Sequence, residues 1–140
     1  MTAAVLDTSA CIYLLDRPPS DLLHRTTRRL VEAQRDLGNQ LIVSPITLSE
    51  LLVKPLALSD IESEARILAF ATSLCSVADV TLEIARRAAL VRAQHGLRLP
   101  DAYIVALALE LNAATVIGND ATWKRVPQLP YVHINDVAKS

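Results

Sequence analysis

Four carboxylates, spread over four segments of this 140-residue chain, are the side chains best suited to chemistry. They are Asp7, Glu50, Asp101 and Asp120. Taken alone, each has an ordinary structural explanation, because aspartates often cap helices or lie in their first turn, and a glutamate on a helix often faces solvent. Gathered at one place, however, four carboxylates would repel each other strongly unless a cation neutralised them. Together they indicate a cation site.

The kind of cation follows from the atoms that these side chains offer as ligands. A site made of oxygen atoms alone, without imidazole or thiolate, suits Mg²⁺ or Mn²⁺. Such an ion polarises a phosphoryl oxygen, lowers the pKa of a bound water and orients that water for in-line attack. We therefore expect all four acids to be metal ligands and catalytic residues for hydrolysis at phosphorus.

Short apolar segments predict the elements that bring the acids together. Ala3–Leu6, which stops at Asp7, is typical of a strand inside a parallel sheet whose two faces are covered by helices. Further strands are predicted at residues 41–44, 74–77, 113–117 and 131–134. Helices are predicted at residues 10–15, 20–37, 59–72, 81–95 and 102–111, and from residue 45 onward. Ligand sites in such sheets lie at the carboxyl ends of the strands, so we expect the acids along that edge.

Glu50 and Asp101 do not follow strands directly, but belong to the helices that come next. Pro45 suits the first position of a helix, which places Glu50 early in it. The leucines around Glu50 predict that its carboxylate is at least partly buried. Asp101 lies in the first turn of the most apolar helix, where the helix dipole favours an anion. Both are therefore expected at the same edge as the acids that end strands.

Composition restricts the class of protein. The length fits a single domain, 51% of the residues are hydrophobic, and the formal net charge of -1 argues against attraction of nucleic acid over the whole surface. The two cysteines, Cys11 and Cys75, lie in apolar stretches and are expected to be buried, reduced thiols. Asp7 interrupts any signal peptide, and no apolar run is long enough for a membrane span. We therefore expect a cytoplasmic protein.

Two groups of arginines could bind the phosphates of a nucleic acid. Arg25, Arg28 and Arg29 form the denser group, on the predicted helix 20–37, and a second group lies at positions 86, 87 and 92. The alternative is an ordinary solvated helix face balanced by nearby acids. We favour the first group as the substrate-binding one, together with the polar residues Thr8 and Asn119 that flank the acids.

The order of these residues resembles the PIN-domain ribonucleases of the VapC toxin type. The resemblance covers nearly the whole chain and rests on residues 5–9 (VLDTS), 49–51 (SEL), 99–102 (LPDA) and 117–120 (IGND), with Trp123 beyond. Matched position by position, Asp7 and Asp101 correspond to the principal metal ligands, Glu50 to the second acid and Asp120 to the fourth. Thr8 corresponds to a hydroxyl residue that often supports the site.

The resemblance implies an α/β/α sandwich around a parallel sheet, formed by one PIN-like domain over residues 1–140. It also implies Mg²⁺-dependent endoribonuclease activity on RNA, dimerisation, and neutralisation by a cognate antitoxin. The last motif departs from the family pattern, which usually reads Thr-x-Asp followed by Asp-Phe. Here Gly118, Thr122 and Trp123 replace the Thr, the second Asp and the Phe, which affects the role of Asp120 most.

Two alternatives come from other classes of protein. Phosphatases resembling haloacid dehalogenases also carry an Asp after their first strand, but they require a second Asp two residues later, where this chain has Ser9. A catalytically silent PIN-like domain that binds RNA or a partner protein would share the same sequence pattern. For the toxin hypothesis, we expect an antitoxin segment to lie in an apolar groove near Cys11, Tyr13, Leu14 and Leu15, and to insert an Arg or Lys among the acids.

Overall fold

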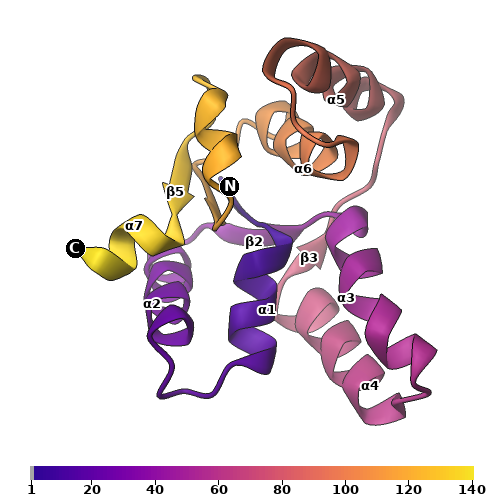
Figure 1. The fold of residues 1–140 in the computed structure, drawn as a ribbon, viewed down its shortest axis with the longest axis vertical. Coiled ribbons are helices and arrows are strands. Elements are labelled where there is room, and N and C mark those ends of the chain that lie inside the picture. Colours follow the sequence, from indigo (N-terminus) through magenta and orange to yellow (C-terminus); the bar gives the residue numbers. More distant parts are fainter. Residues whose placement is uncertain (1) are drawn as a thin grey trace.

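Within residues 2–140, which this computed structural model describes, five strands form one parallel sheet with helices on both faces (Figure 1). The strands are β1 (Ala3–Leu6), β2 (Gln40–Val43), β3 (Ser76–Val77), β4 (Thr115–Gly118) and β5 (Tyr131–His133), in the spatial order β3-β2-β1-β4-β5. The helices are α1 (Thr8–Asp16), α2 (Leu22–Asp36), α3 (Pro45–Ala57), α4 (Ile61–Ala69), α5 (Leu82–His95), α6 (Leu99–Glu110) and α7 (Ile134–Lys139). The predicted α/β sandwich around a parallel sheet is confirmed.

The central strand β1 carries Asp7 to the middle of the sheet edge. It is hydrogen-bonded to β2 on one side and to β4 on the other, with Val5 opposite Ile42 and Val116. Successive residues of a strand point to opposite faces, so Val5 packs into one layer and Leu6 into the other. Both side chains are fully buried. Asp7, the next residue, therefore lies at the carboxyl edge of the sheet with a packed layer on either side of it.

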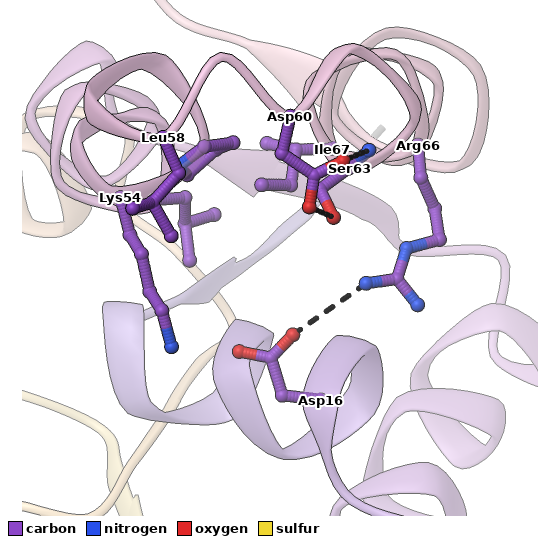
Figure 2. Close-up of a pocket in the computed structure, with 9 residues that line it drawn as sticks. Asp16, Lys54, Leu58, Asp60, Ser63, Arg66 and Ile67 are labelled. Atoms are coloured by element: carbon purple, nitrogen blue, oxygen red, sulfur yellow. Dashed lines mark hydrogen bonds and ion pairs between the residues drawn. The ribbon is translucent and has the colours of Figure 1, made fainter.

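One layer is formed by α1, α2, α3, α4 and α7, which lie on the same side of the sheet in Figure 1. A cavity of about 270 Å³ opens in this layer between α1 and the α3–α4 pair. Figure 2 shows Asp16 of α1 paired with Arg66 of α4 across it, at 3.7 Å, with Lys54 and Leu58 on the α3 side. Cys11 is fully buried against the sheet, so it does not line a surface groove as we had expected.

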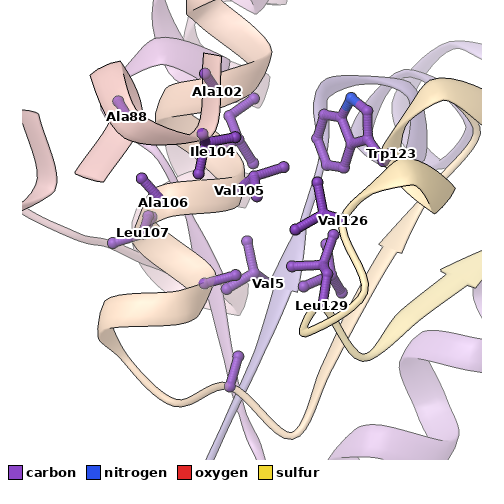
Figure 3. Close-up of a cluster of buried hydrophobic side chains, with 14 of the residues drawn as sticks. Val5, Ala88, Ala102, Ile104, Val105, Ala106, Leu107, Trp123, Val126 and Leu129 are labelled. Carbon is purple, nitrogen blue, oxygen red and sulfur yellow. The ribbon is translucent and has the colours of Figure 1, made fainter. Parts of the chain in front are cut away.

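The other layer consists of α5 and α6 with the 3₁₀ helix Ala121–Arg125 and the loop that follows it. Figure 3 shows Ile104 and Val105 of α6 on one side of this cluster and Trp123, Val126 and Leu129 on the other, with Val5 of the sheet between them. Trp123 is 1% exposed and belongs to the core. Burying a ring as large as that of Trp123 removes a large apolar area from water, and this stabilises the folded protein.

Local signals set most of the helix ends. α1 stops before Pro18, since the residue before a proline avoids helical angles, and α5 ends at Gly96 with a φ of +71°. The predicted helix 59–72 divides into α4 and a π-helical turn at Phe70–Leu74. α7 was not predicted from the sequence. In the part of the chain that the structure covers, no helix has the length and apolar character needed to cross a membrane.

Candidate active site

Asp7 is held at the edge of the sheet by two backbone amides from different parts of the chain. Its Oδ1 accepts a hydrogen bond from Ala10 N (2.7 Å), which caps α1, and its Oδ2 accepts one from Asn119 N (3.3 Å). The residue is 3% exposed, and this burial raises the pKa of its carboxyl to about 7 despite both hydrogen bonds. The charges of Asp101 and Asp120 raise the pKa further. Asp7 is thus both a helix cap and a member of the acidic cluster.

Glu50 stands on the first turns of α3 and is tied to α1 by a hydroxyl. Thr8 Oγ1 donates to Glu50 Oε1 at 2.7 Å and lies 3.2 Å from Thr47 Oγ1. Glu50 is exposed, so the expectation that it is partly buried was wrong. The leucines around it turn toward the sheet, while its own position on the helix turns outward. Thr8 supports an acid, as the resemblance implied.

Asp101 lies in the first turn of α6 and is paired with the nearest arginine along the chain. Arg98 Nε is 3.4 Å from Asp101 Oδ2, and the side chains are 77% and 15% exposed respectively. Burial raises the pKa of Asp101, Arg98 lowers it, and the charges of Asp120 and Glu50 raise it again. These mutual effects place Asp101 within electrostatic range of the other three acids.

Asp120 follows β4 and caps the 3₁₀ helix. Its Oδ1 accepts from Thr122 N (2.8 Å) and from Thr122 Oγ1 (2.6 Å), so the threonine at this position serves the acid directly. Its backbone is bound by Tyr131 of β5: the phenolic oxygen accepts from Asp120 N and donates to Asp120 O, both at 2.9 Å. The other carboxylate oxygen, Oδ2, makes no hydrogen bond within the described residues.

The side chain of Asn119 is hydrogen-bonded to other parts of the protein through both its amide nitrogen and its oxygen. Its Nδ2 donates to Tyr13 Oη at 2.8 Å, and its Oδ1 accepts from Asn135 N at 2.8 Å. The side chain therefore links α1 to the start of α7. It fixes the loop that follows β4, whose residue Asp120 is an acid of the site and whose Asn119 amide binds Asp7. This geometry gives Asn119 a positioning role, and its expected contact with substrate stays a prediction.

The donor set suits a hard divalent cation. The charges of Asp101 and Asp120 act on Asp7, and those of Asp120 and Glu50 act on Asp101. Among the described residues, Arg98 forms the ion pair with one of these acids, Asp101. Within residues 2–140, no three or more His, Cys, Asp or Glu side chains are close enough together to hold one ion. Mg²⁺ does not require this, because it is usually bound by one or two carboxylates and keeps several waters.

The arginines of the first basic group lie apart from the acids in the hydrogen-bond network. Arg25 donates to Ser20 O (2.6 Å), Arg28 pairs with Glu32 (2.8 Å), and Arg29 lines a cavity between α2 and α7. All three are exposed. In the second group, Arg87 pairs with Glu110 and Arg92 donates to Leu97 O. Neither group contacts an acid of the site in the described residues.

Two contributors to the site were missed by reasoning from the sequence. Arg98 was not predicted to belong to the site, although its spacing of three residues from Asp101 at the start of a predicted helix is a usable signal. Tyr131 carries no such signal. It reaches Asp120 only because β4 and β5 are paired, with Gly118 opposite His133.

The family model for the PIN domain matches residues 4–129 of the chain, which include all four acids. The chain belongs to the PIN domain family. No curated protein matches the sequence significantly. The PIN fold explains why β1, α3, α6 and β4 deliver acids to the same edge.

Solved structures of toxin–antitoxin proteins are similar to this PIN domain. A chain of VapBC2 from Rickettsia felis, bound to a DNA fragment from its promoter, matches with a TM-score of 0.77 and 20% identity over 94% of this chain and 98% of that one. A toxin–antitoxin complex from Klebsiella pneumoniae matches with a TM-score of 0.74, 25% identity and the same coverage. VapC20 from Mycobacterium tuberculosis, a toxin that cleaves the sarcin-ricin loop, matches with a TM-score of 0.68 and 17% identity over 87% of this chain and 93% of that one.

Proposed function

We propose that this chain is a Mg²⁺-dependent endoribonuclease and the toxin of a toxin–antitoxin pair. The observation that carries the proposal is the convergence of acids from different segments: Asp7 and Asp120 follow the paired strands β1 and β4, and the charges of Asp120 and Glu50 both raise the pKa of Asp101. Keeping buried carboxylates close together costs folding free energy, and a cation that binds them recovers it. The similarity to VapC20, a toxin that cleaves an RNA loop, supports RNA as the substrate.

Asp7 and Asp101 are the best candidates to hold the metal, because both are shielded from water and burial raises the pKa of both. A bound Mg²⁺ would act as a Lewis acid on the phosphate and make a nearby water more acidic. Asp7 is oriented by Ala10 N and Asn119 N, which leaves lone pairs on both of its oxygens for a cation.

Glu50 and Asp120 are the acids suited to act on the water that attacks the phosphate. Glu50 is exposed, is oriented by Thr8, and forms no ion pair in the described residues. In this proposal it would accept the proton of the attacking water. Asp120 has an oxygen, Oδ2, free of hydrogen bonds within the same part of the chain, and this oxygen would bind the same ion beside Asp7 and help to orient that water. The leaving oxygen of the RNA strand then takes a proton from solvent.

Cleavage of purified total RNA tests this proposal. The wild-type protein should cut RNA with Mg²⁺ and stop when EDTA is added, and Asp101→Asn should lose at least about 100-fold in rate while its far-UV spectrum is unchanged. Asp16→Asn, which alters an exposed acid at the other end of α1, is the matched control and should cut normally. Sequencing the new 5′ ends would then reveal the preferred site.

RNA binding without cleavage is the rival outcome. The absence of a compact group of three acidic ligands in the described residues favours this alternative of a silent PIN domain. It would be adopted if wild-type protein retained RNA on a filter yet left it intact at every Mg²⁺ or Mn²⁺ concentration.

The cavity beside α1 supports an antitoxin as partner. It lies at the end of α1 where Asp16 is found, whereas Asp7 caps the opposite end, and a nine-residue helix is about 13 Å long. An extended segment of about four residues lying along α1 would therefore reach from the cavity to the acids. Leu58, at the rim, is 67% exposed and offers an apolar anchor. Tyr13, Leu14 and Leu15, which were expected to line the groove, are half-buried against the core of this layer and do not line the cavity.

An Arg or Lys of that segment would bind among the acids in place of Mg²⁺. Inhibition by the cognate antitoxin should therefore weaken as Mg²⁺ is raised, and also when the inserted cation is changed to Ala. Leu58→Asp should weaken the complex at least about tenfold, while Leu111→Asp, an exposed leucine beyond α6 in the other layer, should not. Inhibition indifferent to all of these changes would show that the acids and the cavity play no part in it.

A homodimer in the cytoplasm completes the proposal. Both cysteines are free and buried, as in proteins of reducing compartments. Light scattering on the purified chain at micromolar concentration would report its mass, and a monomer at every concentration would remove the dimer from the proposal.

A further inference from the structure

The hydroxyl of Tyr131 binds the backbone of the one acid whose family motif is altered in this chain. It accepts a hydrogen bond from Asp120 N and donates one to Asp120 O, so a single oxygen satisfies both polar backbone groups of that residue. Asp120 lies just after β4, whereas Tyr131 is the first residue of β5, at the other end of the connecting loop. A change in the position of this hydroxyl would therefore move Asp120.

The same hydroxyl also approaches Asp7 through the space left by Gly118. A Cβ atom built on Gly118 would lie 2.4 Å from Asp7 Oδ2 and 3.0 Å from Tyr131 Oη. The carboxylate of Asp7 and the phenol of Tyr131 thus border one small space that only a glycine leaves open. The backbone amide of Asn119, the next residue, donates to that same Asp7 oxygen.

The rest of the tyrosine is fixed independently of its hydroxyl. Its ring packs on Trp123 with centroids 5.6 Å apart, and Trp123 is itself buried in the core. The β4–β5 register places Tyr131 opposite Val116, four residues before Asp120. Removing the hydroxyl alone therefore leaves the ring anchored and separates the effect of the oxygen from that of packing.

We propose that Tyr131 is a positioning residue of the acidic site, whose hydroxyl sets the loop of residues 118–120 so that Asp7 and Asp120 are held at the distance a divalent ion needs. This inference rests on the proposed function, because it assumes that the acids bind a metal. Partners that orient the ligands of a metal typically change its affinity about 10- to 100-fold when they are removed. Tyr131 acts through Asp120 and is not itself a ligand.

The test measures Mn²⁺ binding to Tyr131→Phe by calorimetry, without RNA. The Mn²⁺ affinity should fall about 10- to 100-fold, and the Mg²⁺ concentration for half-maximal cleavage should rise by a similar factor. Affinity for RNA in EDTA should stay unchanged. The matched control is Tyr103→Phe, since the Tyr103 hydroxyl makes no hydrogen bond in the described residues, and it should bind Mn²⁺ like the wild type.

Each outcome decides a different claim. If Tyr131→Phe and the wild type bind Mn²⁺ equally, Tyr131 has no positioning role, although the proposed function survives. If the wild type itself binds no Mn²⁺, the proposed function fails and this inference fails with it. Should Tyr131→Phe not fold, Tyr131→p-aminophenylalanine replaces it, because its amino group donates to Asp120 O but accepts poorly from Asp120 N. An intermediate loss of affinity supports the proposal, and an unchanged affinity overturns it.

Discussion

Asp7→Asn should stabilise the metal-free protein at alkaline pH while abolishing cleavage. Burial raises the pKa of Asp7 from 3.8 to about 7, so the folded protein holds this proton more tightly than the unfolded chain does. The stability contributed by that proton is present in full below pH 3.8 and is lost as the pH rises to about 7. At pH 8, the folded wild-type protein therefore carries the whole cost of a buried charge.

The magnitude follows from the size of the shift. At about 1.4 kcal/mol for each pKa unit, the charge of Asp7 costs on the order of 4 kcal/mol at pH 8. Asparagine offers one acceptor oxygen, so one of the two amides bonded to Asp7 loses its partner, at about 1 kcal/mol. The net gain of about 3 kcal/mol should raise Tm by about 10 °C in a chain of this length. At pH 4, the gain should disappear.

Thermal unfolding in EDTA, followed by circular dichroism at pH 8 and pH 4, provides the assay. The matched control is Asp60→Asn, because Asp60 also caps a helix but is exposed, and its bonds to Ser63 hold the pKa of its carboxyl below the usual range. That variant should gain no stability at pH 8. The reasoning is refuted if Asp7→Asn is no more stable than the wild type at pH 8, or if its advantage is the same at pH 4.

Three further predictions concern the support of the site, the core and the surface. Thr8→Val removes the hydroxyl that orients Glu50 and should lower the cleavage rate about tenfold, as steady-state kinetics would show. Calorimetry should find a change in Tm no larger than the loss of its two hydrogen bonds, to Glu50 and Thr47, explains. Trp123→Ala leaves a cavity in the core and should cost about 3 to 5 kcal/mol in chemical denaturation, and a loss below 1 kcal/mol would contradict its assigned packing. Replacing the arginines at 25, 28 and 29 with Gln should weaken RNA binding. In a plot of log affinity against log salt concentration, the slope should become shallower by about one for each phosphate that is no longer bound. An unchanged slope would assign these arginines to the solvated surface.

The sequence allowed the positions of the strand-end acids to be predicted because the evidence for them is local. Ala3–Leu6 is apolar and stops at Asp7, and the segment before Asp120 repeats this pattern, so the strand and the place of its acid follow from neighbouring residues. Parallel sheets then put both acids at the same edge. The start of α3 at Pro45 likewise followed from a local rule.

Features that depend on contacts between distant segments could not be predicted in this way. Whether Glu50 is buried or exposed depends on the rotation of α3 about its axis against the sheet. The leucines near Glu50 lie on more than one side of the helix and therefore do not define that rotation, and Glu50 is in fact exposed. Tyr131 joins the site through strand pairing. Trp123 enters the core because the turn that carries it folds back over α6, and a short polar segment gives no sign of this.

Anomalous diffraction from crystals soaked in Mn²⁺ tests the metal site most directly. The account predicts one strong peak at the carboxyl edge of β1, within about 2.1 Å of oxygen atoms of Asp7 and Asp101, and no such peak in crystals of Asp7→Asn. Absence of a peak at this edge in the wild-type protein, at Mn²⁺ concentrations that support RNA cleavage, would contradict the account.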